Sequence, residues 1–239
     1  MRLDKLLTDM QIGSRSEVKR YIRQGSITVD GSAEVSPKMQ VHPDEQEIFC
    51  FGKRLNYQKY VYYMFHKPGG CVTACRDAKY KTVMDYIPKQ VRDLSPVGRL
   101  DLDTEGLLLI TNDGALSHAL LSPAKHVKKI YEAKIEGAVT KEDAELFAEG
   151  VEIGDPTKTR PAKLVIKKSD VISDVEITIT EGRYHQIKRM FLAVGKKVIY
   201  LKRIGMGNLM LDASLSPGAY RALTTQEIAL LKEREEPHV

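Results

Sequence analysis

The chain has 239 residues, of which 42% are hydrophobic and 29% charged, as in an ordinary globular protein that can bury a substantial core. No apolar run approaches the roughly 18 residues that cross a bilayer, and no signal-like segment opens the sequence, so we expect a cytoplasmic protein without a membrane partner. Three sparse cysteines exclude a disulfide framework and favour idle or buried thiols over a zinc site.

Basic residues are concentrated in two segments. Residues 1–25 contain six basic and three acidic side chains, and residues 181–203 contain seven basic and one acidic. The whole chain carries a net charge of +5. Clustered positive charge is what a phosphate-binding surface requires, so the distribution points to an anionic partner more strongly than the net charge does.

Two short helices are predicted at the beginning of the chain. Apolar residues of the segment 3–10 recur at helical spacing and predict an amphipathic helix. Ser14 and Glu17 form a capping-box pattern that begins a second helix, and Gly25 is typical of its end. A strand at 27–29 and a tight turn at Asp30-Gly31 complete a small hairpin.

The second helix carries a basic stripe at i, i+4 and i+8, formed by Arg15, Lys19 and Arg23. Such a stripe taken alone is more typical of a solvated helix face than of a binding surface. The whole unit of residues 1–55, however, resembles the S4 RNA-binding domain. In that family the second helix and the turn after it contact RNA, which implies that Arg15, Lys19 and Arg23 bind RNA.

The remaining sequence predicts a larger domain at residues 60–235, after a polar linker at 51–59. Strands are expected at 61–65, 107–111, 130–135 and 174–180, a turn that leads into a helix at 182–194, and a closing helix at 225–233. Because strands do not alternate regularly with helices, the pattern predicts an α+β fold around a mixed or antiparallel sheet, preceded by the small N-terminal domain.

A loop rich in charge lies immediately before the predicted strand at 107–111. Gly98 and Gly106 bracket it, which indicates a sharp turn or a close approach to another segment. Its charged side chains are Arg99, Asp101, Asp103 and Glu105. Three interpretations compete: a solvated turn, a calcium loop that lacks its final glutamate and exiting helix, and a catalytic loop on a rigid scaffold.

Four motifs resemble those of the RsuA/RluA-type pseudouridine synthases. Residues 98–108, Gly-Arg-Leu-Asp-Leu-Asp-Thr-Glu-Gly-Leu-Leu, match the signature in which the aspartate, here Asp101, is catalytic. Lys-Lys-Ile-Tyr at 128–131 is the second match, and the resemblance implies that Tyr131 lies against the target base, as the corresponding tyrosine does in the family. In Glu-Gly-Arg-Tyr-His-Gln-Ile-Lys-Arg-Met at 181–190, Lys188 is the expected ion-pair partner of Asp101. A weaker match, His-Lys-Pro-Gly-Gly, lies at 66–70.

The resemblance implies isomerisation of a uridine in ribosomal RNA to pseudouridine, without a cofactor or a metal. Whether Asp101 attacks C6 of the base, attacks C1′ of the sugar or assists a glycal intermediate stays open. Arg99 is expected to hold phosphate or help extrude the base, while Asp103 and Thr104 are expected to shape the loop. Further substrate or RNA contacts are expected from Arg183, His185, Gln186 and Arg189.

The S4-like unit and the tail at 215–224 resemble the branch of the family that modifies small-subunit RNA, which implies 16S rRNA. The expected partner is ribosomal RNA or an assembling small ribosomal subunit, and we expect a monomer. Two alternatives stay open: a synthase acting on 23S rRNA, and a non-catalytic S4-type protein that binds rRNA during ribosome assembly.

Overall fold

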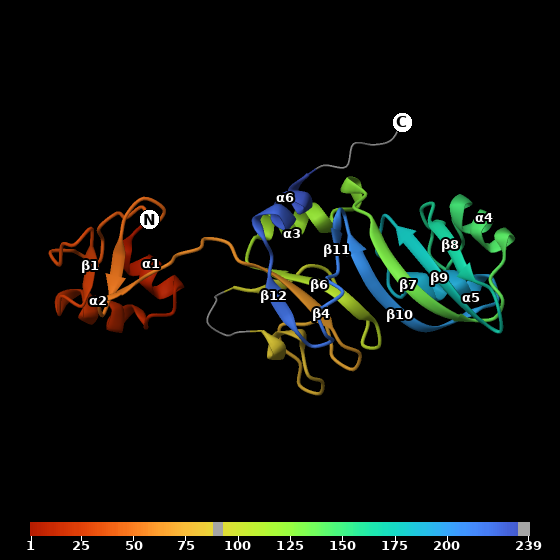
Figure 1. Ribbon diagram of the computed structural model, residues 1–239, viewed down its shortest axis with the longest axis horizontal. Helices are drawn as coiled ribbons and strands as arrows, with labels where there is room; N and C mark the ends of the chain where they lie inside the picture. The colour runs from red at the N-terminus through yellow and green to blue at the C-terminus, as the bar shows by residue number, and fades with distance from the viewer. Residues whose placement is uncertain (88–92, 234–239) are drawn as a thin grey trace. The chain divides into compact units, whose positions relative to one another are not determined.

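The computed structural model describes residues 1–87 and 93–233, and the chain forms two compact units (Figure 1). We call Met1–Val61 the N-terminal unit, and Tyr62–Ile87 together with the chain from Ser95 onward the C-terminal unit. The predicted end of the larger domain at residue 235 lies outside the described residues. Within the described residues, no helix is long and apolar enough to cross a membrane.

The N-terminal unit contains two helices and a three-stranded antiparallel sheet in the order β1-β2-β3. Its elements are α1 (Leu3–Asp9), α2 (Arg15–Arg23), β1 (Ile27–Val29), β2 (Ile48–Cys50) and β3 (Lys53–Arg54). The predicted apolar stripe is confirmed, since Leu3, Leu6 and Leu7 are fully buried in one core. The capping box of Ser14 and Glu17 is present at the start of α2.

Two local predictions differ from the structure of this unit. Asp30 and Gly31 do form a tight turn at positive φ, but only an isolated bridge closes it, and β1 pairs with β2 instead of a strand that follows the turn. The predicted linker begins with a hairpin, because β3 pairs with β2 across the turn Phe51-Gly52. Both residues of β3 are exposed and charged, so hydrophobicity could not reveal it.

The C-terminal unit is built on a mixed sheet of nine described strands, with a main order of β12-β4-β6-β10-β7-β9-β8. The strands are β4 (Tyr62–Lys67), β5 (Ser95–Pro96), β6 (Glu105–Thr111), β7 (Lys129–Glu136), β8 (Lys163–Lys168), β9 (Ile172–Ile179), β10 (Lys197–Met206), β11 (Leu209–Met210) and β12 (Tyr220–Ala222). Only β6 and β10 pair in parallel among these strands, so the predicted mixed-sheet α+β fold is confirmed.

Helices cover this sheet in two groups (Figure 1). The helices of the unit are η1 (Val83–Tyr86), α3 (Gly114–Leu121), η2 (Pro123–Lys125), α4 (Lys141–Glu149), α5 (Gln186–Ala193) and α6 (Thr225–Lys232). The α-helices among them form the two groups. Helices α3 and α6 share an apolar cluster with β4 and β6, whereas α5 packs on β10 and α4 on β8. The rings of Phe147 on α4 and Phe191 on α5 meet edge to face, 5.0 Å apart.

Strands β7 and β9 alternate between buried and exposed side chains along their length, as predicted for half-buried strands. Tyr131, Ala133 and Ile135 therefore point to the buried face of the sheet. The turn predicted to lead into a helix over 182–194 is confirmed, since a turn precedes α5 and His185 at its start has left-handed backbone angles.

Candidate active site

The loop before β6 is held rigidly on the side that leads into Asp101. The hydroxyl of Thr73 donates to the carbonyl of Leu100 at 2.8 Å and accepts from the amide of Leu100 at 3.1 Å. Both hydrogen bonds are buried. Leu100, the residue before Asp101, is therefore held through its amide and its carbonyl. Gly98, at φ +75°, allows the turn that starts the loop, as predicted.

Lys67 fixes the other side of the same loop. Its ammonium group donates to three carbonyl oxygens, those of Pro68 at 3.1 Å, Leu102 at 3.3 Å and Thr104 at 2.9 Å. Burial lowers the pKa of Lys67, although nearby anionic groups, among them Asp103 and Asp101, act in the opposite direction. In the sequence, Lys67 belongs to the weakest of the four motif matches, at residues 66–70. Its contact with the loop of Asp101 was not predicted.

Four adjacent strands contribute a continuous row of residues across the sheet: Lys67, Gly106, Arg203 and Tyr131. A side chain at Gly106 would collide with the backbone of Arg203, so only glycine allows β6 and β10 to approach this closely. The predicted close approach is therefore found at Gly106, and its partner is the neighbouring strand.

Asp101 lies in a compact charge cluster with residues of α5. Lys188 Nζ is 3.2 Å from Asp101 Oδ2 and 2.6 Å from Asp103 Oδ1. His185 Nε2 lies 3.6 Å from Asp101 Oδ1. The side chain of Asp101 is 28% exposed, so it is sheltered but reachable from solvent. The structure thus brings Asp101, Lys188 and His185 together and adds Asp103, which the sequence reasoning treated only as a loop residue.

The charges of this cluster stabilise one another. Partial burial disfavours the Lys188 ammonium, but its hydrogen bond to Asp103 and the charge of Asp101 outweigh burial and raise the pKa of Lys188. Burial likewise acts to raise the pKa of Asp103, and the hydrogen bond from Lys188 reverses this and lowers it. Thr104 differs from the prediction, because its buried hydroxyl has no hydrogen-bond partner among the described residues.

Tyr131 lies beside Arg203 in the cross-strand row and is only 7% exposed. It makes no hydrogen bond with Asp101 or Lys188 in the described part of the chain. Arg203 is buried, and its Nε donates to the carbonyl of Leu107 at 2.7 Å. Burial and the charge of Arg203 together lower the pKa of nearby Lys129 to about 8, so two cations crowd this part of the sheet.

A second network surrounds Asp155. Arg189 Nη2 lies 2.5 Å and Arg183 Nη1 3.4 Å from the Asp155 carboxylate. Arg183 also donates to the carbonyls of Thr157 and Lys158, both at 2.7 Å. Gln186 is buried and joins the backbone amide of Arg183 to the Glu181 carboxylate. These predicted RNA contacts therefore have structural partners within the chain, and nothing in the sequence pattern indicated Asp155.

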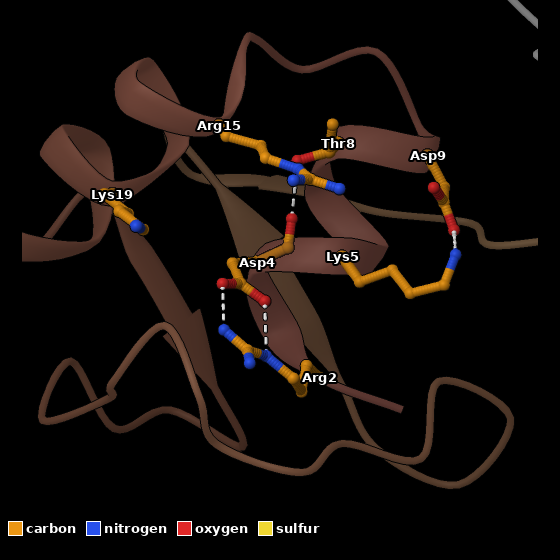
Figure 2. Close-up of a pocket in the computed structure, with 7 residues that line it drawn as sticks. All are labelled: Arg2, Asp4, Lys5, Thr8, Asp9, Arg15 and Lys19. Carbon is orange, nitrogen blue, oxygen red and sulfur yellow. Dashed lines mark hydrogen bonds and ion pairs between the residues drawn. The ribbon is translucent and has the colours of Figure 1, made fainter.

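The predicted basic stripe lies on the N-terminal unit. A hollow of about 370 Å³ lies there, and Figure 2 shows the residues that line it: Arg2, Asp4, Lys5, Thr8, Asp9, Arg15 and Lys19. Asp4 pairs with Arg2 and Asp9 with Lys5, each at 2.6 Å. Arg15 and Lys19 have no ion-pair partner among the described residues, so they are available to an external anion. Arg23 is exposed outside this lining, and Arg99 is exposed in the loop before Asp101.

Comparison with known families identifies the fold around this site. A family model described as RNA pseudouridylate synthase matches residues 61–193, and an S4 domain model matches residues 1–46. The chain belongs to the RNA pseudouridylate synthase family. The loop with Asp101 and the helix with Lys188 both lie inside the matched region.

Relatives of this pseudouridine synthase match nearly its whole length. The uncharacterized RNA pseudouridine synthase YtzG of Bacillus subtilis is 47% identical over 98% of this chain and 99% of its own. Ribosomal small subunit pseudouridine synthase A of Escherichia coli K12 is 40% identical over 96% and 99%. A solved structure described as a pseudouridylate synthase has a TM-score of 0.69 at 38% identity and covers 97% of this chain and 99% of its own.

Proposed function

We propose that this pseudouridine synthase isomerises a uridine of 16S ribosomal RNA and that Asp101 is its catalytic carboxylate. The ion pair between Asp101 and Lys188 carries this proposal, because it places a cation 3.2 Å from a carboxylate in a sheltered loop. The choice of RNA is supported by relatives named ribosomal small subunit pseudouridine synthase A, at 40% identity in Escherichia coli and 42% in Yersinia pestis.

The reaction breaks the N1–C1′ bond, turns the uracil and joins C5 to C1′. C5 loses a proton and N1 gains one, so the product is an isomer of the substrate and the overall change needs no oxidant and no water. Asp101 would act at C6, at C1′ or as a base that promotes a glycal; precedent for a carboxylate at an anomeric carbon exists in retaining glycosidases. Lys188, 3.2 Å away, would hold the carboxylate in place through the ion pair.

Other site residues receive supporting roles in this proposal. Tyr131, on the buried face of β7, would stack on the uracil and relay a proton. Arg99, exposed two residues before Asp101, would hold a phosphate while the base leaves its stack, which costs a few kcal/mol. His185 lies beside Asp101 and would contact the flipped nucleotide. Arg183, Gln186 and Arg189 would order the adjoining surface, and the partly exposed guanidinium groups of the two arginines would contact RNA.

We further propose that the chain works as two domains, at 1–55 and 60–235, with Arg15, Lys19 and Arg23 of the first domain binding phosphates of the RNA. The unpaired cations of the N-terminal hollow support this assignment. In this proposal the protein is a cytoplasmic monomer, and its partner is ribosomal RNA or an assembling small subunit.

Pseudouridine mapping tests the proposal. Purified protein is incubated with unmodified 16S and 23S rRNA, and products are located by carbodiimide adducts that stop reverse transcriptase. We expect one stop in 16S RNA, absent with Asp101→Asn and retained at reduced rate with Asp103→Asn, since both acids contact Lys188. Turnover by Asp101→Asn would refute the catalytic role of Asp101. A stop only in 23S RNA would refute 16S RNA as the substrate. No stop in either RNA, even in assembling subunits, would favour a binding protein.

A further inference from the structure

The turn between β2 and β3 has an unusual residue in its first position. Phe51 and Gly52 connect the two strands with φ angles of 50° and 75°. A two-residue turn of this kind strongly prefers Asn-Gly or Asp-Gly, because both positions lie in the left-handed region. A bulky aromatic residue is disfavoured there, so Phe51 is held in a backbone conformation that its side chain does not suit.

Burial does not account for this residue. Phe51 is 63% exposed, more than any other phenylalanine or tyrosine described in the N-terminal unit. Its backbone amide donates to the carbonyl of Ser26 at 2.8 Å, which fixes the turn against the start of β1. A strained conformation that yields little packing is a reason to look for an external ligand.

The ring of Phe51 is part of an aromatic pair, and basic residues lie on the elements that carry the pair. The Tyr21 ring on α2 meets it edge to face, with centroids 5.0 Å apart and planes at 72°. The guanidinium of Arg20 lies 5.4 Å from the centre of the Tyr21 ring. Lys53 is exposed directly after the turn, and Arg23 is exposed at the end of α2. An exposed, oriented aromatic ring on elements that also carry exposed cations matches an unpaired base and its flanking phosphates.

We propose that Phe51, oriented by Tyr21, is a stacking platform for one unpaired base of the RNA, with Arg20 and Lys53 beside the flanking phosphates. This surface differs from the hollow of Figure 2, whose lining contains none of these four residues. The inference rests on the proposed binding of RNA by the N-terminal unit. It adds a contact that recognises a base without reading its sequence, because every base has a face that can stack.

The first test replaces Phe51 with asparagine in the full-length protein. Asparagine suits the left-handed turn position, so Phe51→Asn should leave the melting temperature unchanged or raise it. The probe is a fluorescein-labelled RNA hairpin with one unpaired adenosine, compared with the same hairpin fully paired. Loss of one stacked base should weaken binding of the unpaired probe about ten-fold and barely change the paired one. Gln11→Asn, at another exposed turn residue with positive φ, is the control and should alter neither.

Phe51→Trp provides an independent signal, because the chain contains no tryptophan. Stacking should quench this single fluorophore with the unpaired hairpin and not with the paired one, and Phe51→Tyr should retain binding. Equal affinity of wild type and Phe51→Asn for the unpaired hairpin would overturn the platform. A lower melting temperature with unchanged binding would show instead that the ring packs against protein. Neither outcome affects the Asp101→Asn mapping, so failure here is distinct from failure of the proposed activity.

Discussion

Gly106 connects the stability of the sheet to the geometry of the site, and replacing it with alanine tests that connection. Gly106 lies at φ +104° on β6, opposite Arg203 on the parallel strand β10. An added Cβ would meet backbone atoms of Arg203, among them its amide nitrogen at 2.7 Å. A strand backbone cannot rotate away as a flexible side chain can, so one of the two strands must move.

Two terms contribute to the cost of Gly106→Ala. An alanine held at positive φ costs about 1 kcal/mol, and inserting a carbon into closely packed structure costs about 1–3 kcal/mol. The sum, roughly 2–4 kcal/mol, is a large fraction of the ~5–15 kcal/mol that stabilises a domain. Moving β6 from β10 would also shift the loop with Asp101 away from Lys188 on α5, so activity should fall even where the variant is folded.

Urea denaturation followed by circular dichroism measures the first effect, and tritium release from RNA labelled at C5 of uridine measures the second. Gly114→Ala is the matched control, since a Cβ there meets nothing within 4 Å at the start of α3, and its effect should stay within about 0.5 kcal/mol. A Gly106→Ala variant as stable and as active as wild type would show that β6 and β10 have space for a Cβ, contrary to this prediction.

Three further predictions concern single features of the two units. Lys67→Met should lower kcat at least ~10-fold with little change in KM, because the loop of Asp101 loses a cation bonded to three carbonyls; unchanged kcat in the folded variant would contradict this. Burial and the hydrogen bond to Glu105 raise the pKa of Tyr200 to about 12, so its contribution to stability is complete below pH ~10 and lost as the pH rises towards 12. Spectrophotometric titration should lose this late ionisation in Tyr200→Phe. Arg15→Ala with Lys19→Ala should reduce the salt dependence of RNA binding by about 1.5 in log–log slope, whereas Lys5→Ala, whose cation is paired with Asp9, should change it less.

Local patterns in the sequence predicted much of the secondary structure. Helices α1 and α2, the capping box of Ser14 and the alternating strand β7 all follow from residue spacing within a short segment. Such patterns can be recognised in the sequence without knowledge of the tertiary structure. Strand β3 escaped prediction because two exposed charged residues carry no hydrophobic period. Family resemblance, more than periodicity, directed attention to Asp101 and Lys188, which lie 87 positions apart and meet only in the fold.

Contacts between distant segments were the part that sequence reasoning could not supply. The clamp of Lys67 on the loop joins residues up to 37 positions apart, and the pairing of Arg189 with Asp155 spans 34. No short-range pattern encodes such a partner, so the motif match and the cluster of positive charge presented Arg183 and Arg189 only as RNA contacts. Their carboxylate partner changes what their charge can do, because a paired guanidinium attracts phosphate less than a free one.

The pairing of Arg189 bears directly on the cluster of Asp101, Asp103 and Lys188. Lys188 and Arg189 are neighbours on α5, and successive side chains on a helix point about 100° apart. Lys188 is bonded to Asp101 and Asp103 in the loop before β6, while Arg189 is bonded to Asp155 in the segment after α4. Helix α5 is thus held from two directions, and it cannot rotate about its axis without breaking one of these pairs. The Asp155 network therefore positions the Lys188 ammonium and, through the ion pair, the carboxylate of Asp101. This effect does not depend on whether Arg183 or Arg189 also contacts RNA.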